Sequence, residues 1–178
     1  QNIFGKNINL SILEIGSNDG SFIEILQKYG YKNVTGVEPS TDVYKISRDK
    51  NQKVYNEFFS SKIYPFNESK GHFEIIITRH VLEHIENLIT FLSDIRFVMN
   101  DEGLLVVEIP DFDGWLENLD YSLWEEHINC FTIEVIDYLF KKSGFLIFHY
   151  EKFLFSGRSM TIYAKKIQNL INIKKPKV

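Results

Sequence analysis

Short apolar segments alternate with amphipathic segments along the chain, and this alternation predicts an α/β fold. Apolar runs rich in β-branched residues predict strands that are buried on both faces, as in a parallel sheet. Apolar residues at helical spacing predict helices that pack one face against that sheet. The predicted strands cover residues 11–15, 33–38, 53–56, 73–78 and 104–109, and the predicted helices cover 21–29, 41–50 and 89–99.

The first predicted helix carries signals at both of its ends. Ser21, with Glu24 three residues later, predicts a capping box at its start, and Gly30 predicts its end. Four apolar residues share the side of the helix that we expect to face the sheet: Phe22, Ile25, Leu26 and Tyr29.

The second half of the chain predicts a long connection, a last helix and a hairpin. Residues 101–103 predict a turn before strand 104–109, and residues 110–131 are polar, aromatic and irregular, which favours a functional lid over a plain linker. A helix is expected from Thr132, with Gly144 ending it. Strands at 146–155 and 160–165, joined by a turn at 156–159, predict a hairpin.

A glycine-rich turn follows the first predicted strand and opens the first predicted helix. Gly16 and Gly20 permit a sharp reversal and a close approach of the backbone to a ligand. Their Gly-x-x-x-Gly spacing differs from the Gly-x-Gly-x-x-Gly of dinucleotide-binding folds, and no phosphate-binding lysine follows. Glu14 lies at the end of the strand and would repel a pyrophosphate. The turn therefore suits a ligand with hydroxyl groups and a positive charge.

A second acid, Glu38, ends the second predicted strand 18 residues after Gly20. This separation is close to that of an acid that binds ribose hydroxyls in nucleotide-binding folds. Taken alone, Glu14 and Glu38 are also compatible with solvated strand ends, because charged residues are mostly exposed. The combination of turn, spacing and both acids favours a cofactor pocket.

These residues resemble the first motif of class I S-adenosylmethionine-dependent methyltransferases, which reads (Asp/Glu)-x-Gly-x-x-x-Gly. The resemblance implies a Rossmann-like, seven-stranded sheet that is mostly parallel, with an antiparallel last strand and helices on both faces. It also implies S-adenosylmethionine as cofactor and S-adenosylhomocysteine as product. The implied cofactor-binding residues are Glu14, Gly16, Ser17, Asn18, Phe22, Glu38, Pro39, Ser40, Phe58, Arg79 and His80.

Phe58 keeps an alternative interpretation, which it shares with its neighbour Phe59. In the family, residues after the third strand lie beside adenine, so Phe58 or Phe59 could stack on the ring, or either could belong to the core. Arg79 and His80 follow the fourth predicted strand, where open α/β sheets bind ligands.

His84 is a candidate substrate-binding residue that also has a structural alternative, a hydrogen bond to a loop carbonyl. Two histidines four residues apart, His80 and His84, with Glu83 between them, suggest zinc only when one helix carries both and a third ligand joins them. The strand-to-helix turn argues against that arrangement, so we predict no metal site.

His127, with Glu126 beside it, is the candidate general base. The segment Trp124 to Thr132 resembles the Glu-His-x-x-x-Phe stretch of sugar methyltransferases, in which the matching histidine is the expected base. An alternative role for His127 is to cap the helix that opens at Thr132. Three further residues are candidate substrate contacts: Tyr121, Trp124 and Arg158.

The same resemblance guides the expected acceptor. It includes C-methyltransferases of nucleotide-linked deoxysugars, but this sequence has neither their cysteine-rich zinc domain nor their large C-terminal domain. We therefore expect methyl transfer to a hydroxyl of a sugar, nucleotide-sugar or phosphorylated small molecule in bacterial surface-polysaccharide biosynthesis. Methylation of a keto-deoxysugar carbon, a nicotinamide-dependent oxidoreductase and a non-catalytic scaffold remain as alternatives.

Composition limits the remaining classes. The net charge of −4 does not favour a nucleic-acid partner, and no apolar run is long enough to span a membrane. The single Cys130 suits a reducing compartment, so we expect a cytoplasmic protein with a small-molecule partner, and a homodimer stays open. We expect one domain over residues 1–165 and a basic tail over 166–178. Because the sequence begins with Gln1, we also expect that it is truncated at its N-terminus.

Overall fold

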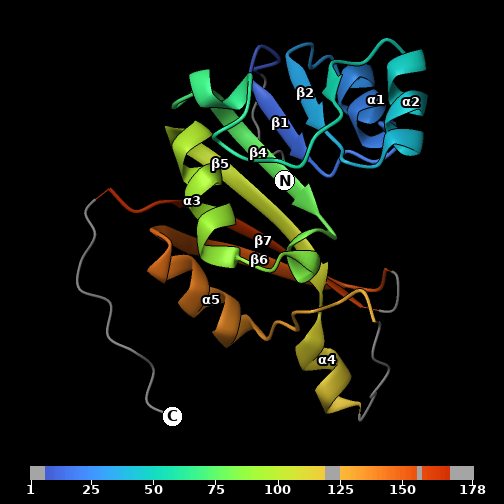
Figure 1. The fold of residues 1–178 in the computed structure, drawn as a ribbon. Helices are drawn as coiled ribbons and strands as arrows, with labels where there is room; N and C mark the ends of the chain where they lie inside the picture. Colours follow the sequence, from blue (N-terminus) through green and yellow to red (C-terminus); the bar gives the residue numbers. More distant parts are fainter. Residues whose placement is uncertain (1–6, 119–124, 156–157, 169–178) are drawn as a thin grey trace.

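The computed structural model describes residues 7–118, 125–155 and 158–168. Seven strands form one sheet in the order β3-β2-β1-β4-β5-β7-β6 (Figure 1). Only β7 runs antiparallel to its neighbours β5 and β6. The prediction of a mostly parallel, Rossmann-like sheet with an antiparallel last strand is confirmed. The strands are β1 (Ile12–Ile15), β2 (Val34–Val37), β3 (Val54–Tyr55), β4 (Phe73–Arg79), β5 (Met99–Pro110), β6 (Phe145–Phe153) and β7 (Ser159–Lys166).

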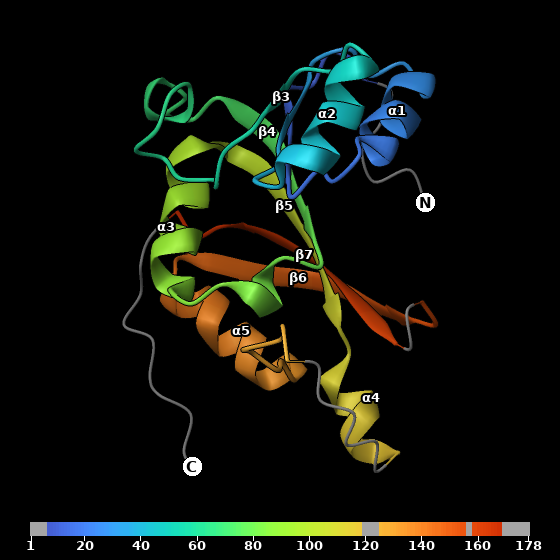
Figure 2. The same cartoon turned by 45° about the vertical axis from the view of Figure 1, so that its right-hand side comes forward.

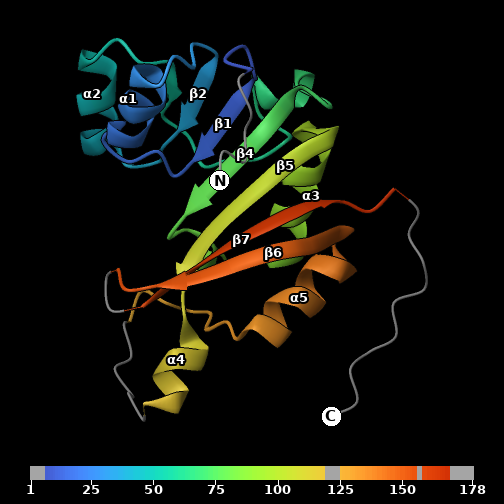
Figure 3. The same cartoon turned by 180° about the vertical axis from the view of Figure 1, so that it is seen from behind.

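Helices cover both faces of the sheet. The helices α1 and α2 lie on one side, whereas α3 and α5 lie on the other (Figure 2). The view from behind shows β5, β7 and β6 in front of α3 and α5 (Figure 3). The bounds are α1 (Ser21–Lys28), α2 (Thr41–Asp49), α3 (Leu88–Val98), α4 (Phe112–Glu117) and α5 (Ile133–Lys142), with short 3₁₀ turns η1 (Phe66–Glu68) and η2 (Leu82–His84).

Each face of the sheet has its own apolar core. The larger core contains Leu92 and Ile95 of α3, and Ile136 and Phe140 of α5, all with no exposed surface. The smaller core joins α1 to residues of β1, β2, β4 and β5. Burial of these side chains drives the layers together, because each removes apolar surface from water. None of the helices in the described ranges combines the length and the apolar character that crossing a bilayer requires.

The predicted capping box of α1 is wrong, and the predicted sheet-facing side is right for Phe22 and Leu26 but wrong for Ile25 and Tyr29. Gly20 precedes the helix with φ 76°, and Ser21 is already its first residue. Ile23 is fully buried and Leu26 is 7% exposed, whereas Ile25 is 46% and Tyr29 is 76% exposed. The reason lies on β2, where a Cβ atom on Gly36 would be 2.8 Å from Ile23 Cδ1. The missing side chain at Gly36 leaves the space that Ile23 fills.

The predicted turn at residues 101–103 is instead a bulge inside β5. Pairing of β4 with β5 passes from Phe73↔Met99 to Ile75↔Leu104, so residues 100–103 form an irregularity within one strand. The polar residues that suggested a turn are accommodated by this bulge.

The predicted lid, residues 110–131, contains a helix that the sequence pattern did not indicate. The short helix α4 extends away from the sheet (Figure 2). Its base is held by Asp111, which has no exposed surface, accepts a hydrogen bond from Gly114 N, and pairs with Lys152 Nζ at 2.8 Å and Arg158 Nε at 3.4 Å. The following helix α5 begins as predicted, because Thr132 Oγ1 accepts a hydrogen bond from Val135 N.

Substitution of Asp111 is expected to destabilise the protein. Asp111→Ala removes a helix cap and leaves two cations without their buried partner, so the free energy of unfolding should fall by about 3 kcal/mol in a urea titration. Asp42→Ala is the control, since Asp42 is 94% exposed in its pair with Lys45 and its loss should change little. Equal stability of the two variants would contradict this role for Asp111.

Candidate functional site

A cleft of about 510 Å³ lies at the carboxyl ends of β1, β2 and β4. This is the edge at which open α/β sheets bind ligands, because the loops that leave the strands diverge there. Its lining residues are Ile15, Gly16, Asn18, Val37, Glu38, Pro39, Phe58, Phe59, Arg79, His80, Val81, His84, Ile85, Phe91 and Phe155. Eight predicted site residues are thus brought together: Gly16, Asn18, Glu38, Pro39, Phe58, Arg79, His80 and His84.

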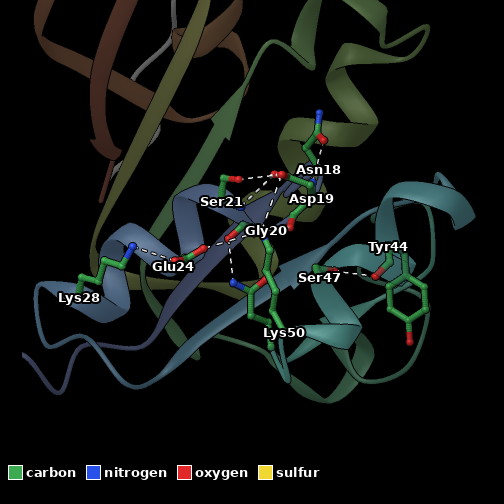
Figure 4. Close-up of polar contacts among 10 residues, drawn as sticks. Asn18, Asp19, Gly20, Ser21, Glu24, Lys28, Tyr44, Ser47 and Lys50 are labelled. Carbon is green, nitrogen blue, oxygen red and sulfur yellow. Dashed lines mark hydrogen bonds and ion pairs between the residues drawn. The ribbon is translucent and has the colours of Figure 1, made fainter.

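The glycine-rich turn forms one wall of the cleft. Gly16 has φ 73° and Asn18 has φ 50°, so the chain reverses through left-handed conformations. A Cβ atom on Gly16 would lie 2.4 Å from Val81 Cγ2, which leaves room for glycine only. Hydrogen bonds of Asp19 hold the turn in place (Figure 4). Its carboxylate accepts hydrogen bonds from the N–H and hydroxyl groups of Ser21, and its main-chain carbonyl accepts one from Lys50 Nζ.

Glu38 joins this turn to the loop that follows β2. One carboxylate oxygen accepts a hydrogen bond from Asn18 N at 2.9 Å, and the other accepts one from Ser40 N at 2.8 Å. The side chain of Asn56 donates to the carbonyls of Glu38 and Pro39 and holds the loop in place. Asn56 was missed in the sequence, although it lies directly after the third strand, where a polar residue reaches this edge.

Glu14 is buried beneath the cleft and pairs with Arg79 of β4. Arg79 Nη2 donates to Glu14 Oε1 at 3.1 Å, and Glu14 is only 1% exposed. Burial raises the pKa of Glu14 to about 7, although the Arg79 charge and hydrogen bond act in the opposite direction. The Arg79 guanidinium carbon also lies 4.1 Å from the centre of the Phe22 ring, a cation–π contact.

His80 lies between two carboxylates. Its Nε2 is 3.0 Å from Glu108 Oε1, and its Nδ1 is 3.3 Å from Glu83 Oε1. The contacts with Glu108 and then Glu83 raise the pKa of His80 to about 9, against the effect of burial. The backbone of His80 has φ 52°, an uncommon conformation for a residue with a side chain. Glu108 was not predicted as a site residue from the sequence. Its place near the end of a strand, directly before Ile109-Pro110, could have indicated it.

The loop that carries His127 is held against η2. His84 Nδ1 donates to the Glu126 carbonyl at 2.6 Å, which confirms the loop-carbonyl alternative for His84. Asn129 forms a clamp, because its N–H donates to the Glu83 carbonyl at 3.0 Å and its side chain donates to the Ile85 carbonyl at 2.8 Å. The rings of His84 and His127 are edge to face with their centroids 5.0 Å apart. Glu126 contacts His84 through its main chain, and its side chain is exposed.

The other predicted site residues lie in varied positions. Phe58 is 80% exposed in the cleft, whereas Phe59 packs edge to face on Phe66 and Phe91 of the core. The side chain of Ser17 faces Gly36, and Arg158 pairs with Asp111 and does not line the cleft. Tyr121 and Trp124 lie outside the described residues.

The polar atoms of the site fit a nucleoside that carries a positively charged amine. Among the described residues, Glu14 Oε2 and Arg79 Nε are buried without a hydrogen-bond partner. Buried polar groups of this kind are costly unless a partner satisfies them. Glu38 presents two fixed carboxylate oxygens, each of which accepts one backbone hydrogen bond and keeps a lone pair for a hydroxyl group.

Known proteins share this fold. The fold is shared with SAM-dependent methyltransferases from Archaeoglobus fulgidus (TM-score 0.73, 18% identity, 89% of this chain and 86% of that chain) and Methanosarcina mazei (0.73, 14%, 92% and 95%). It is also shared with a Thermotoga maritima protein described as a possible histamine N-methyltransferase (0.67, 18%, 89% and 83%). A search of curated proteins finds no match. The family described as "Methyltransferase domain" matches residues 3–150, and the chain therefore belongs to this methyltransferase family.

Proposed function

We propose that this protein transfers a methyl group from S-adenosylmethionine to a hydroxyl of a small polar acceptor, with His127 as general base. The observation that carries the proposal is the pair of carboxylates at the ends of neighbouring parallel strands, Glu38 in the cleft and Glu14 beneath it. The two acids lie on either side of the glycine-rich turn. The family supports the reaction class, and the cofactor follows from the fit of these groups.

Each part of the cofactor has a matching group in the cleft. Glu38 is held by two backbone N–H groups, so its carboxylate is oriented before the ribose hydroxyls arrive. Glu14 supplies a negative charge for the amino-acid end, and the exposed face of Phe58 is available to stack on adenine. When bound, S-adenosylmethionine supplies a methyl group already activated by its sulfonium.

The protein's own task is then to align the acceptor and accept its proton. Alignment alone can contribute about 7–11 kcal/mol in favourable intramolecular models. His127 is half-buried beside His84, which lines the cleft, and an imidazole is the side chain whose ordinary pKa suits a base near neutral pH. Glu126 helps to place it, because its carbonyl is tied to His84.

The nature of the acceptor rests on the sugar-methyltransferase resemblance of the Glu126-His127 stretch. A sugar, nucleotide-sugar or phosphorylated small molecule of bacterial surface-polysaccharide biosynthesis is the proposed class, with His84 among its contacts. His80 lines the cleft, but Glu108 and Glu83 already balance its charge, so it adds no net positive charge for an acceptor. A screen of nucleotide-sugars, with mass-spectrometric detection of an added methyl group, tests this class directly.

Loss of the Glu38 charge is expected to weaken cofactor binding. Glu38→Gln replaces an acceptor-only group by one with a single carbonyl, and a charge-assisted hydrogen bond contributes about 1.5–3 kcal/mol. Calorimetric titration with S-adenosylmethionine should therefore show affinity about 10- to 100-fold lower, while Glu57→Gln, in an exposed side chain, should match the wild type. Binding of NAD in place of S-adenosylmethionine would overturn the proposed cofactor, and binding of neither would favour a scaffold.

Cofactor affinity is expected to depend on pH through Glu14. Its pKa of about 7 means that the carboxyl group is largely protonated below pH 7, whereas a positively charged amine prefers the ionised form. Affinity should therefore fall by up to about tenfold per unit as the pH decreases below about 7, with proton release on binding. Calorimetry in buffers of different ionisation enthalpy measures that release. Glu14→Gln should remove the pH dependence, and a pH dependence that persists would assign it to another group.

Removal of the proposed base should separate turnover from binding. His127→Asn is expected to lower turnover by about 10²-fold or more, because general-base catalysis contributes about 10²–10⁴-fold, while cofactor affinity stays near the wild-type value. His149→Asn on β6 is the control, since His149 does not line the cleft and its side chain pairs with Glu151. Turnover of His127→Asn near the wild-type rate would remove His127 from the mechanism.

A further inference from the structure

Three metal-ligating side chains meet beside the cleft. Glu83 and His84 come from η2, and His127 comes from the loop that follows α4. One ligand atom from each of the three side chains lies within 4.8 Å of the others. We propose that Glu83, His84 and His127 form a binding site for a divalent transition-metal ion such as Zn²⁺.

The Glu83 carboxylate is buried and lacks hydrogen bonds to any described residue. Glu83 is 1% exposed, and neither of its oxygens has a hydrogen-bond partner within the described residues. Within the part of the chain that the structure describes, its charged contact is with His80 at 3.3 Å, and His80 is shared with Glu108 at 3.0 Å. Two carboxylates therefore face one imidazole, and a buried charge without hydrogen bonds is costly. A cation bound to Glu83 would remove that cost.

One hydrogen bond fixes which nitrogen of His84 carries the proton. Because Nδ1 donates to the Glu126 carbonyl at 2.6 Å, the ring carries its proton there and Nε2 has the lone pair. Metal-binding histidines usually donate their second ring nitrogen to a carbonyl or a carboxylate in this way, which fixes the tautomer and the ring orientation. The hydrogen bond to a loop carbonyl is thus also the support that a metal ligand needs.

The turn η2 and the loop that carries His127 are already held together. The Asn129 clamp fixes the loop to the carbonyls of Glu83 and Ile85, and the His84 hydrogen bond adds another connection. Ligands at about 2.1 Å from one tetrahedral ion lie roughly 3.4 Å apart, so ligand atoms that now lie within 4.8 Å of one another would have to approach by at most about 1.4 Å.

The donor set indicates which ions are preferred. Two imidazoles and one carboxylate form the His₂Glu set of catalytic zinc sites, which keep a fourth position open for water or a substrate oxygen. His80 is held by Glu108 at 3.0 Å and is not one of the three ligands. The third ligand lies 43 residues after His84, too far along the chain for spacing to reveal it.

The site goes beyond the proposed methyl transfer and does not depend on it. A His127 nitrogen that binds an ion cannot also accept a proton, so the general-base role proposed for His127 belongs to the metal-free protein. For this reason the test measures ion binding alone, without cofactor or acceptor. Its failure would leave the proposed methyltransferase function untouched.

The experiment is a titration of the metal-free protein with Zn²⁺ by calorimetry and with Co²⁺ by visible absorption. We expect one ion per chain and the intense absorption bands of tetrahedral Co²⁺. His84→Ala and His127→Ala should each weaken binding at least 30-fold, and His149→Ala on β6 should leave it unchanged. Zn²⁺ should also raise the melting temperature of the wild type, but not of His127→Ala, because only the native site binds it.

Two outcomes would overturn the site. Wild-type affinity no greater than that of His84→Ala and His127→Ala would show that the three side chains do not act together. Cys130 is a separate exposed thiol three residues after His127, so Cys130→Ser is the matched control. Loss of binding in Cys130→Ser, with binding retained in His84→Ala, would assign the ion to the thiolate. Weaker ion binding by Glu83→Gln supports the site only if the unfolding curve of this variant matches that of the wild type.

Discussion

The cleft depends on the Glu38 carboxylate, which accepts backbone hydrogen bonds from both loops that enclose the cofactor side. The Asn18 N–H comes from the turn after β1, and the Ser40 N–H comes from the loop after β2. One buried side chain thus fixes two segments that are separated in sequence and adjacent in the sheet. Hydrogen bonds to an ionised group are stronger than those between neutral groups, so this contact orders the turn without a ligand.

Negative charge gathers along this edge of the sheet. Glu14, Glu38, Glu83 and Glu108 are each at most 13% exposed, and they are accompanied by Arg79 and His80. Four carboxylates against two cationic groups create a local field that favours cationic ligands, since the low-dielectric surroundings screen it poorly. The sulfonium and amine of the proposed cofactor, and the divalent ion of the proposed metal site, meet this same requirement.

Much of this arrangement could be predicted from local sequence. The Gly16–Gly20 spacing and the acid at position 38 predicted residues that line the cleft, because turn geometry and strand ends are short-range properties. The burial of Ile23 rather than Ile25 could not be predicted in this way. It depends on Gly36, a residue on another strand, whose missing side chain decides which face of α1 packs.

The contacts around His80 and His84 that the sequence did not predict have a similar cause. Glu108 and His80 meet through the pairing of β4 with β5, and Glu83, His84 and His127 meet through a clamp made by Asn129. These contacts join positions tens of residues apart, and no periodicity in the sequence encodes them. Residues 100–103 form a bulge where the sequence predicts a turn, because turns and bulges use the same polar residues.

The narrow space above Gly16 has a consequence for which residues position 16 can accept. One added carbon there would lie 2.4 Å from Val81 Cγ2, and the left-handed backbone, with φ 73°, is itself unfavourable for a residue with a side chain. The two constraints are independent of each other. Shortening the side chain at position 81 would remove the steric conflict but not the backbone strain, so no single compensating substitution could restore a larger residue at position 16.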